Sequence, residues 1–469
     1  MYFRLKVSLP FKALLLFFLI LSFAKGASIP SFDGKNFVPN IFEFWKGYDA
    51  RKEPLKVQVV ESSKMEQGEV RLVLYSLGKL QGSNKSASPV IAAYLGLPKG
   101  KEKESKPGIV HVHGGGQRAN RRRVEDWMKM GYACVSINWG GKVLEKADTP
   151  NTDWDGLAAG FIRPGVTKAD QLDHHNTVRP DPNTLFKEPH PLNSSWNLIS
   201  ICVRRALTML EQTEGVDPDK LGVEGHSMGG RSTVISCIDP RVNAASPSVG
   251  GSGYLYDDLW GLPGSARRMT ESDGSVLYRK CVSAQSHWPH VTAPILFLGS
   301  TNDFNSPTEW VVKGMSKLPS ETERMLVLAP HLNHRFTDQT SAARFMWMEA
   351  NLKKSFRFPK VSHGELVLDT DNGIPLFRVQ VDQSSGLPVK AVEIYYGYAR
   401  DPRIRFWRSA EVLQLLQLGG RRVERLQLGV VHLDAGELTH GDRMRQLLVR
   451  VGRLQQQIAL AWGEAFGRH

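Results

Sequence analysis

The hydrophobic positions of the chain form short runs, separated by segments whose apolar residues recur at helical spacing. In one such segment Leu198, Cys202, Ala206 and Leu210 lie four positions apart, which predicts an amphipathic helix. The runs themselves are mostly apolar, as in strands buried on both faces of a parallel sheet. They occupy residues 70–75, 89–97, 108–113, 132–139, 221–223, 294–299 and 325–329. This order of runs and helical segments predicts an α/β fold with a mostly parallel sheet flanked by helices.

The pattern changes to short alternating segments after residue 357. Apolar and polar residues alternate over 364–368, 376–381, 389–396 and 404–407, which favours a small C-terminal β-sandwich-like domain. We therefore assign the α/β domain to residues 29–357 and a β-rich accessory domain to 358–410. Residues 411–469 form an atypical tail rich in Arg, Leu and Gln, without clean strand patterns or helix caps.

The first 26 residues have the pattern of an export signal. Basic residues precede an apolar run of twelve, ALLLFFLILSFA at 13–24, and Ala24 and Gly26 provide small residues at a cleavage position. Twelve apolar residues are too few for a comfortable bilayer span. We expect a cleaved signal peptide at 1–26, a secreted or periplasmic location and no stable membrane anchor.

Composition and charge narrow the classes of partner. The chain of 469 residues is 41% hydrophobic and 23% charged, which fits a folded protein. Its formal net charge of +13 becomes +9 without the four basic residues of segment 1–26. No zinc-finger spacing, basic heptad helix or aromatic RNA-binding signature accompanies that charge, so we expect no nucleic-acid partner. The positions of the four cysteines favour buried thiols and leave one disulfide open.

A pentad of the form G-x-S-x-G offers a candidate nucleophile, Ser227. Gly225-His226-Ser227-Met228-Gly229 follows an apolar run and precedes helical spacing. A serine hydroxyl needs a nearby base and a position clear of the backbone to act as a nucleophile. A sharp strand-to-helix turn provides that position, and small flanking residues let the two elements pack closely.

An acid and a base follow at the ends of two later strands. Asp303 comes after the run 294–299, and His334 comes after the run 325–329. The order Ser, Asp, His, with each residue on a loop after a strand, is that of an α/β-hydrolase triad. His331 is a rival base, and Asp257 and Asp258 are alternative acids.

The glycines after the strand 108–113 predict the remaining part of such a site. A negative charge that develops on a carbonyl oxygen needs backbone N–H donors held in place beforehand. We expect these donors at Met228, directly after the serine, and at Gly115 and Gly116 in the segment His113-Gly114-Gly115-Gly116-Gln117.

Two irregular segments, about 140–193 and 250–286, interrupt the α/β pattern and are expected to form a cap or rim. Trp154 and Trp260 in these segments are candidate sugar-stacking residues, although loop anchoring explains Trp154 equally well. The adjacent histidines His174 and His175 do not converge on one point from a regular element, so we expect no metal and no other cofactor.

Together these motifs resemble exported bacterial acetyl xylan esterases of the dienelactone-hydrolase-like group of α/β-hydrolases. The resemblance rests on HGGGQ at 113–117, GHSMGG at 225–230, GSTNDFNSP at 299–307 and HLNHRF at 331–336. It implies a serine esterase that deacetylates O-acetylated polysaccharide without a cofactor. A serine peptidase of the prolyl-oligopeptidase type and a non-catalytic carbohydrate-binding protein on a hydrolase fold remain alternatives.

Overall fold

The computed structural model describes the α/β domain and several short strands beyond it. The described residues are 41–81, 86–100, 105–146, 148–155, 195–252, 281–303, 305–361, 365–367, 376–379, 381–382, 394–397, 407–410 and 426–428. The expected signal segment and most of the expected cap and second rim segment lie outside these residues.

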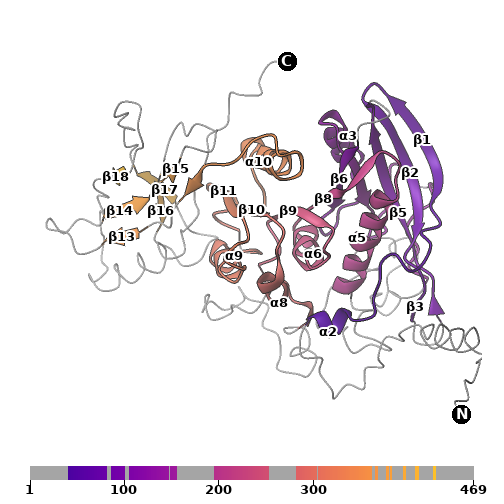
Figure 1. The fold of residues 1–469 in the computed structure, drawn as a ribbon, viewed down its shortest axis with the longest axis horizontal. Coiled ribbons are helices and arrows are strands. Elements are labelled where there is room, and N and C mark those ends of the chain that lie inside the picture. Colours follow the sequence, from indigo (N-terminus) through magenta and orange to yellow (C-terminus); the bar gives the residue numbers. More distant parts are fainter. Residues whose placement is uncertain are drawn as a thin grey trace, which may run out of the picture.

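A nine-stranded sheet forms the centre of the domain (Figure 1). Its spatial order is β1 (Gln58–Met65), β2 (Gly68–Ser76), β5 (Val90–Pro98), β7 (Ala133–Ile137), β6 (Lys106–Val112), β8 (Val216–His226), β9 (Val242–Ser248), β10 (Ile295–Ser300) and β11 (Arg324–Ala329). The pairs from β1 to β7 are antiparallel, and those from β7 to β11 are parallel. The carboxyl ends of the parallel strands therefore meet at one edge of the sheet.

Helices cover both faces of this sheet (Figure 1). The core on one face includes residues of α5 (Ser195–Glu211) and α6 (Met228–Ser236), and the core on the other includes residues of α3 (Arg121–Lys129) and α10 (Asp338–Met348). Shorter elements are α2 (Ile41–Trp45), α8 (Ala284–His287), η7 (Trp288–His290), α9 (Thr308–Met315) and the π-helical turn η8 (Glu349–Lys353). The predicted α/β-hydrolase architecture is confirmed.

The central strands lie where the apolar runs predicted them, but the first strand was missed. β1 pairs with β2 at the edge of the sheet, and its residues are exposed or half-buried along their whole length. An edge strand of this kind needs no apolar run, so its sequence gives no clear strand signal. Strands β3 (Leu80–Gln81) and β4 (Ser86–Ala87) form a small separate pair.

Short antiparallel strands continue beyond Phe358. They are β12 (Lys360–Val361), β13 (Glu365–Val367), β14 (Leu376–Val379), β15 (Val381–Asp382), β16 (Ile394–Gly397), β17 (Trp407–Ala410) and β18 (Leu426–Leu428). They pair as β12 with β15, β13 with β14, β14 with β18, and β16 with β17. The sequence pattern did not predict β18, which comes from the tail 411–469.

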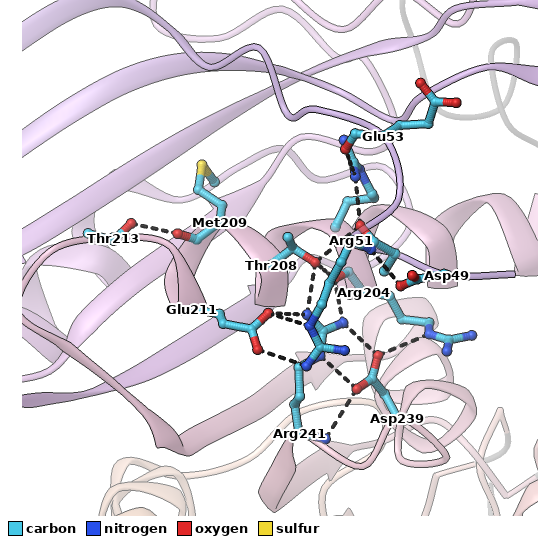
Figure 2. A network of polar contacts seen from close by, with 12 residues as sticks. Asp49, Arg51, Glu53, Arg204, Thr208, Met209, Glu211, Thr213, Asp239 and Arg241 are labelled. Carbon is cyan, nitrogen blue, oxygen red and sulfur yellow. Dashed lines mark hydrogen bonds and ion pairs between the residues drawn. The ribbon is translucent and has the colours of Figure 1, made fainter. Parts of the chain in front are cut away.

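An arginine–carboxylate network joins α5 to the turn after α6 (Figure 2). Asp239 accepts hydrogen bonds from Arg241 at 2.7 and 2.9 Å and from Arg204 of α5 at 3.0 Å. Burial acts to raise the pKa of Asp239, but these arginines outweigh it and lower the pKa to about 2. Glu211, at the end of α5, binds Arg241 and receives two hydrogen bonds from Arg51. The network therefore fixes three separate segments of the chain against one another.

Arg205 performs a similar task for the N-terminal segment. Arg205 lies on α5, and the residue is 1% exposed. It donates to the backbone carbonyl oxygens of Ala50, Glu53, Pro54 and Ser76 at 2.6 to 3.0 Å. Because three of these oxygens belong to the segment before β1 and the fourth to the last residue of β2, Arg205 holds that part of the chain against α5.

All four cysteines are buried as free thiols. Burial raises the pKa of Cys134, Cys202 and Cys237, so these thiols stay protonated and unreactive. Within the described part of the chain, no helix has both the length and the apolar composition needed to cross a bilayer.

Two buried histidines should make the fold sensitive to mild acid. Burial lowers the pKa of His111 and of His287 from 6.5 to about 4, so both are neutral in the folded protein near neutral pH. Between pH 6.5 and about 4 the unfolded chain binds protons that the folded chain does not. As the pH is lowered through this range, the free energy of unfolding should therefore fall by about 1.4 kcal/mol per pH unit for each histidine.

His287→Gln should reduce this acid sensitivity by the share of one histidine. Its amide can replace the hydrogen bond between His287 Nδ1 and the carbonyl oxygen of Ser283, which measures 2.9 Å. Urea unfolding at several pH values between 4 and 7 measures the slope for variant and parent. Equal slopes for the two proteins would show that the lowered pKa of His287 does not contribute to the acid sensitivity.

Candidate active site

Ser227 stands at the sharp turn between β8 and α6, at the carboxyl edge of the sheet. Its backbone has φ 57° and ψ −113°, a conformation that non-glycine residues rarely adopt. Its N–H donates to Ser248 of β9 at 2.8 Å, and its carbonyl oxygen accepts from Arg231 of α6 at 3.1 Å. The side chain is half-buried and thus reachable from solvent. The predicted strand–serine–helix turn is present.

Glycines make the close packing around this turn possible. A Cβ atom on Gly225 would lie 2.3 Å from the carbonyl oxygen of Gly229, and one on Gly229 would lie 2.0 Å from that of Val112. A Cβ atom on Gly250 would lie 1.8 Å from the carbonyl oxygen of Ser227. Contacts this short with backbone atoms exclude any side chain, so three strands and a helix can meet only through glycine.

The structure brings Ser227, His334 and Asp303 together in one hydrogen-bonded chain. His334 Nε2 lies 2.7 Å from Ser227 Oγ. On the other side of the ring, Nδ1 lies 2.9 and 3.1 Å from the two carboxylate oxygens of Asp303. A carboxylate can only accept, so Nδ1 donates to Asp303, and in the neutral form of the ring Nε2 can accept from the serine hydroxyl. This is the arrangement that a nucleophilic serine requires.

Asp303 is held rigidly behind the histidine. Its side chain is fully buried, and its Oδ1 accepts backbone hydrogen bonds from Asn305 at 2.8 Å and Ser306 at 3.1 Å. The residue closes a turn directly after β10 by donating its own N–H to Ser300. Aimed from this turn, the carboxylate fixes the orientation of the imidazole.

The rival base, His331, occupies a different position. Its backbone is left-handed, with φ 58°, and its N–H donates to Thr301 Oγ1 at 2.9 Å. The side chain is exposed, whereas the contact with Ser227 belongs to His334. His331 therefore helps to shape the turn that delivers His334. The alternative acids Asp257 and Asp258 lie outside the described residues.

The glycine-rich loop after β6 is pinned on several sides. Gln117 accepts from the N–H of Gly114 at 2.9 Å, and Lys142 donates to the carbonyl oxygen of Gly116 at 3.0 Å. Gly116 itself has φ 70°, a value suited to glycine. The amide of Gly114 thus donates within the loop itself and is not one of the donors predicted at Gly115 and Gly116. The sequence did not predict the contact of Lys142 with this loop, because Lys142 belongs to no recognisable motif.

Trp154 is an anchor in this structure rather than an open stacking surface. It is 5% exposed, and its indole N–H donates to the carbonyl oxygen of Trp139 at 3.1 Å. Trp139 in turn stacks on His113, with ring centroids 4.7 Å apart, and donates to its carbonyl oxygen at 3.0 Å. The prediction that Trp154 stacks on sugar is therefore corrected, because the residue is buried and its indole N–H is bound to Trp139.

His226, inside the pentad, lies beside the base. Its ring centroid is 5.7 Å from that of His334 and 5.3 Å from that of Phe336, which meets it edge-on. Burial, with a smaller effect of His334 and Arg344, lowers the pKa of His226 to about 3. The ring therefore stays neutral near neutral pH and does not compete electrostatically with protonation of His334.

Three of the six described non-glycine residues with positive φ lie at this edge of the sheet. Besides Ser227 and His331, Val249 has a positive φ of 43°, which is rare for a β-branched residue. Ser227 and Val249 directly follow β8 and β9, and His331 follows β11 by two residues. Such strain persists only where the surrounding structure enforces it, and it is characteristic of functional sites.

Some predicted residues lie outside the described part of the chain. Trp260, His174 and His175 are among them, so the structure does not place them. Among the described residues there is no group of three or more His, Cys, Asp or Glu side chains that could hold a metal ion.

No family model matches the chain, and no curated protein matches its sequence. Solved structures do resemble it. An acetyl xylan esterase from Paenibacillus sp. R4 is 18% identical, with a TM-score of 0.47 over 65% of this chain and 91% of that one. Acetyl xylan esterase 1 from Thermoanaerobacterium sp. JW/SL YS485 is 15% identical, with a TM-score of 0.47 over 67% and 95%. An acylaminoacyl peptidase of Pyrococcus horikoshii is 15% identical, with a TM-score of 0.42 over 66% and 51%. Matches at this level do not define a substrate.

Gly229→Ala should disrupt the turn that carries Ser227. The added methyl group would lie 2.0 Å from a backbone oxygen of β6, which cannot move without distorting the sheet. We expect the free energy of unfolding to fall by roughly 3 kcal/mol. Gly215→Ala is the control, because Gly215 has φ 78° but nothing within 4 Å of an added Cβ. That variant should lose only about 1–2 kcal/mol. Equal losses in urea unfolding would contradict the packing argument.

Proposed function

We propose that the chain is a serine carboxylesterase that works through a covalent acyl-serine intermediate. The observation that carries this proposal is the hydrogen-bonded chain from Asp303 through His334 to Ser227, at 2.9 and 2.7 Å. All three side chains come from loops that follow parallel strands, and Ser227 is reachable from solvent. A non-catalytic carbohydrate-binding protein would not need this relay.

The first half of the reaction acylates the serine. Ser227 Oγ attacks the acyl carbon of the ester while His334 Nε2 takes the hydroxyl proton. Asp303 stabilises the imidazolium that forms and keeps its proton on Nδ1 directed at the carboxylate. His334 then gives the proton on Nε2 to the leaving alcohol, and the acyl group stays on Ser227.

Backbone amides stabilise the negative charge of the tetrahedral intermediate. The Met228 amide is suited to this role, because the first N–H groups of α6 have no partner within the helix. Gly115 or Gly116 supplies the second donor from the pinned loop after β6. Removing one such donor typically costs about a hundred- to thousandfold in rate.

The second half of the reaction releases the acid. Water enters where the alcohol left, and His334 takes its proton as it attacks the acyl carbon. Collapse of the second tetrahedral intermediate breaks the bond to Ser227 Oγ, which recovers its proton from His334. No cofactor is needed at any step of this scheme.

We assign acetylated polysaccharide as the substrate on the sequence resemblance. The motifs at 113–117, 225–230, 299–307 and 331–336 carry that resemblance. Export fits a polymeric substrate, and the pattern of residues 1–26 supports it. A serine peptidase of the prolyl-oligopeptidase type uses the same triad and is the second candidate. Trp260 remains a proposed sugar contact.

The triad assignment predicts distinct outcomes for the two neighbouring histidines. Ser227→Ala should abolish turnover of p-nitrophenyl acetate while the protein stays folded. His334→Ala should lower kcat by at least about a thousandfold, because the serine loses its base. His331→Ala should lower kcat by less than about tenfold, because that ring does not contact the serine.

Steady-state kinetics with circular dichroism as a folding control measures these effects. Asp303→Asn should impair kcat more than Asp257→Asn does. Near-normal activity of the Ser227→Ala protein would discard the mechanism, and a larger loss from His331→Ala than from His334→Ala would move the base.

The proposed substrate class is tested by a screen of acetylated polysaccharides beside peptide amides. Acetate release from acetylated xylan or a related polymer should exceed hydrolysis of peptidyl p-nitroanilides by orders of magnitude in kcat/KM. The reverse preference would favour the peptidase. Activity on p-nitrophenyl acetate without any acetate release from the polymers would leave a carboxylesterase with a different natural ester.

A further inference from the structure

An ion pair is completely buried beneath the candidate triad. Glu224 lies on β8, three residues before Ser227, and Arg344 lies on α10, which begins shortly after His334. Their exposed fractions are 0% and 2%. Arg344 Nη1 donates to Glu224 Oε2, and Trp127 Nε1 donates to the other oxygen at 2.8 Å. The pair thus connects the strand of the nucleophile to the helix that follows the base.

The glutamate is charged in this buried position. Burial acts to raise the pKa of Glu224, but the charges of Arg344 and Arg123 outweigh it and lower the pKa to about 2. Arg123, on α3, lies 3.6 Å from the carboxylate. His111 stands opposite Glu224 on β6 and is bonded to Ser136 at 2.8 Å. A polar row therefore crosses the middle of the sheet in an otherwise apolar layer.

Arg344 also contacts the segment that carries the base. The centre of its guanidinium lies 5.3 Å from the ring centroid of Phe336, two residues after His334. Phe336 meets the ring of His226 edge-on, and His226 adjoins His334. A continuous set of contacts hence runs from Glu224 through Arg344 and Phe336 to His226. The ring of His226 in turn lies beside that of His334.

Stability alone does not explain why the protein retains this pair. Two charges buried at this depth lose their hydration, and an apolar pair of similar volume is often as stable or more stable. A guanidinium, however, can bind a carboxylate in its plane and cover an aromatic ring with its face. Arginine can make both contacts at once. It can therefore hold β8, through Glu224, at a fixed position relative to the segment of the base, through Phe336.

We propose that Arg344 is a positioning residue that sets the distance between Ser227 and His334. The inference rests on the proposed esterase function. Glu224 fixes the guanidinium relative to the nucleophile strand, and the guanidinium fixes Phe336 and thereby the loop of the base. Loss of this bridge leaves the substrate site intact but lets the 2.7 Å contact between His334 Nε2 and Ser227 Oγ lengthen.

The test measures kcat, KM and the urea midpoint of a double variant and compares each with the value for the parent protein. Glu224→Gln combined with Arg344→Met removes both charges of the pair, and Arg123, which also faces Glu224, keeps a side chain that is 20% exposed to solvent. The urea midpoint should stay within about 0.5 M of the parent. For p-nitrophenyl acetate, kcat per active site should fall at least about tenfold, because a small displacement of a base weakens proton transfer. KM should change by less than about twofold. The burst of p-nitrophenol at low pH counts the active sites.

Arg205→Met is the matched control. Arg205 is equally buried, but it binds backbone oxygens of the N-terminal segment rather than the triad. This variant should lose stability while kcat per active site stays within about twofold of the parent. Arg344→Lys keeps the charge and loses the planar face, so its kcat should fall even though the ion pair survives.

Three outcomes decide the matter. A folded double variant with kcat within about twofold of the parent would make the pair structural and overturn the inference. If the double variant does not fold, unchanged kcat in Arg344→Lys overturns it, and a reduced kcat with unchanged KM supports it. A parent chain that does not hydrolyse the ester at all would overturn the proposed function, and this inference with it.

Discussion

The strained backbone of Ser227, with its positive φ, is the constraint on which the rest of the site depends. At φ 57° the residue stores unfavourable conformational energy, which the hydrogen bond to Ser248 and the packing of glycines must offset. In return, the hydroxyl projects beyond the end of β8 and the helix α6 starts at once with Met228. Every other candidate group is arranged around that fixed point, from loops that end at the same edge of the sheet.

Rigid polar contacts extend this arrangement outward in two layers. Directly around the site, buried Asp303 orients His334, and Gln117 and Lys142 pin the glycine-rich loop. Below it, the Glu224–Arg344 pair replaces apolar packing at the centre of the sheet. Polar groups in such positions cost free energy unless they are fully bonded. The Glu224–Arg344 pair lies under the serine, which ties that cost to the geometry of the site.

The sequence predicted the parts of this account that depend on local order along the chain. Buried parallel strands appear as apolar runs, and residues that follow them must meet at one edge, so Ser227, Asp303 and His334 could be proposed together. Features that depend on distant contacts could not be predicted. Glu224 and Arg344 are separated by 120 positions, β1 lacks an apolar run because it is an edge strand, and burial of Trp154 depends on Trp139.

Covalent labelling tests the central claim most directly. A fluorophosphonate reacts only with a serine whose hydroxyl is activated by a neighbouring base, and peptide mass mapping then locates the adduct. The account predicts a single adduct on Ser227 that forms rapidly in the parent chain and is lost in a chain without the His334 imidazole. An adduct on another residue, or no reaction under conditions where the protein is folded, would contradict it.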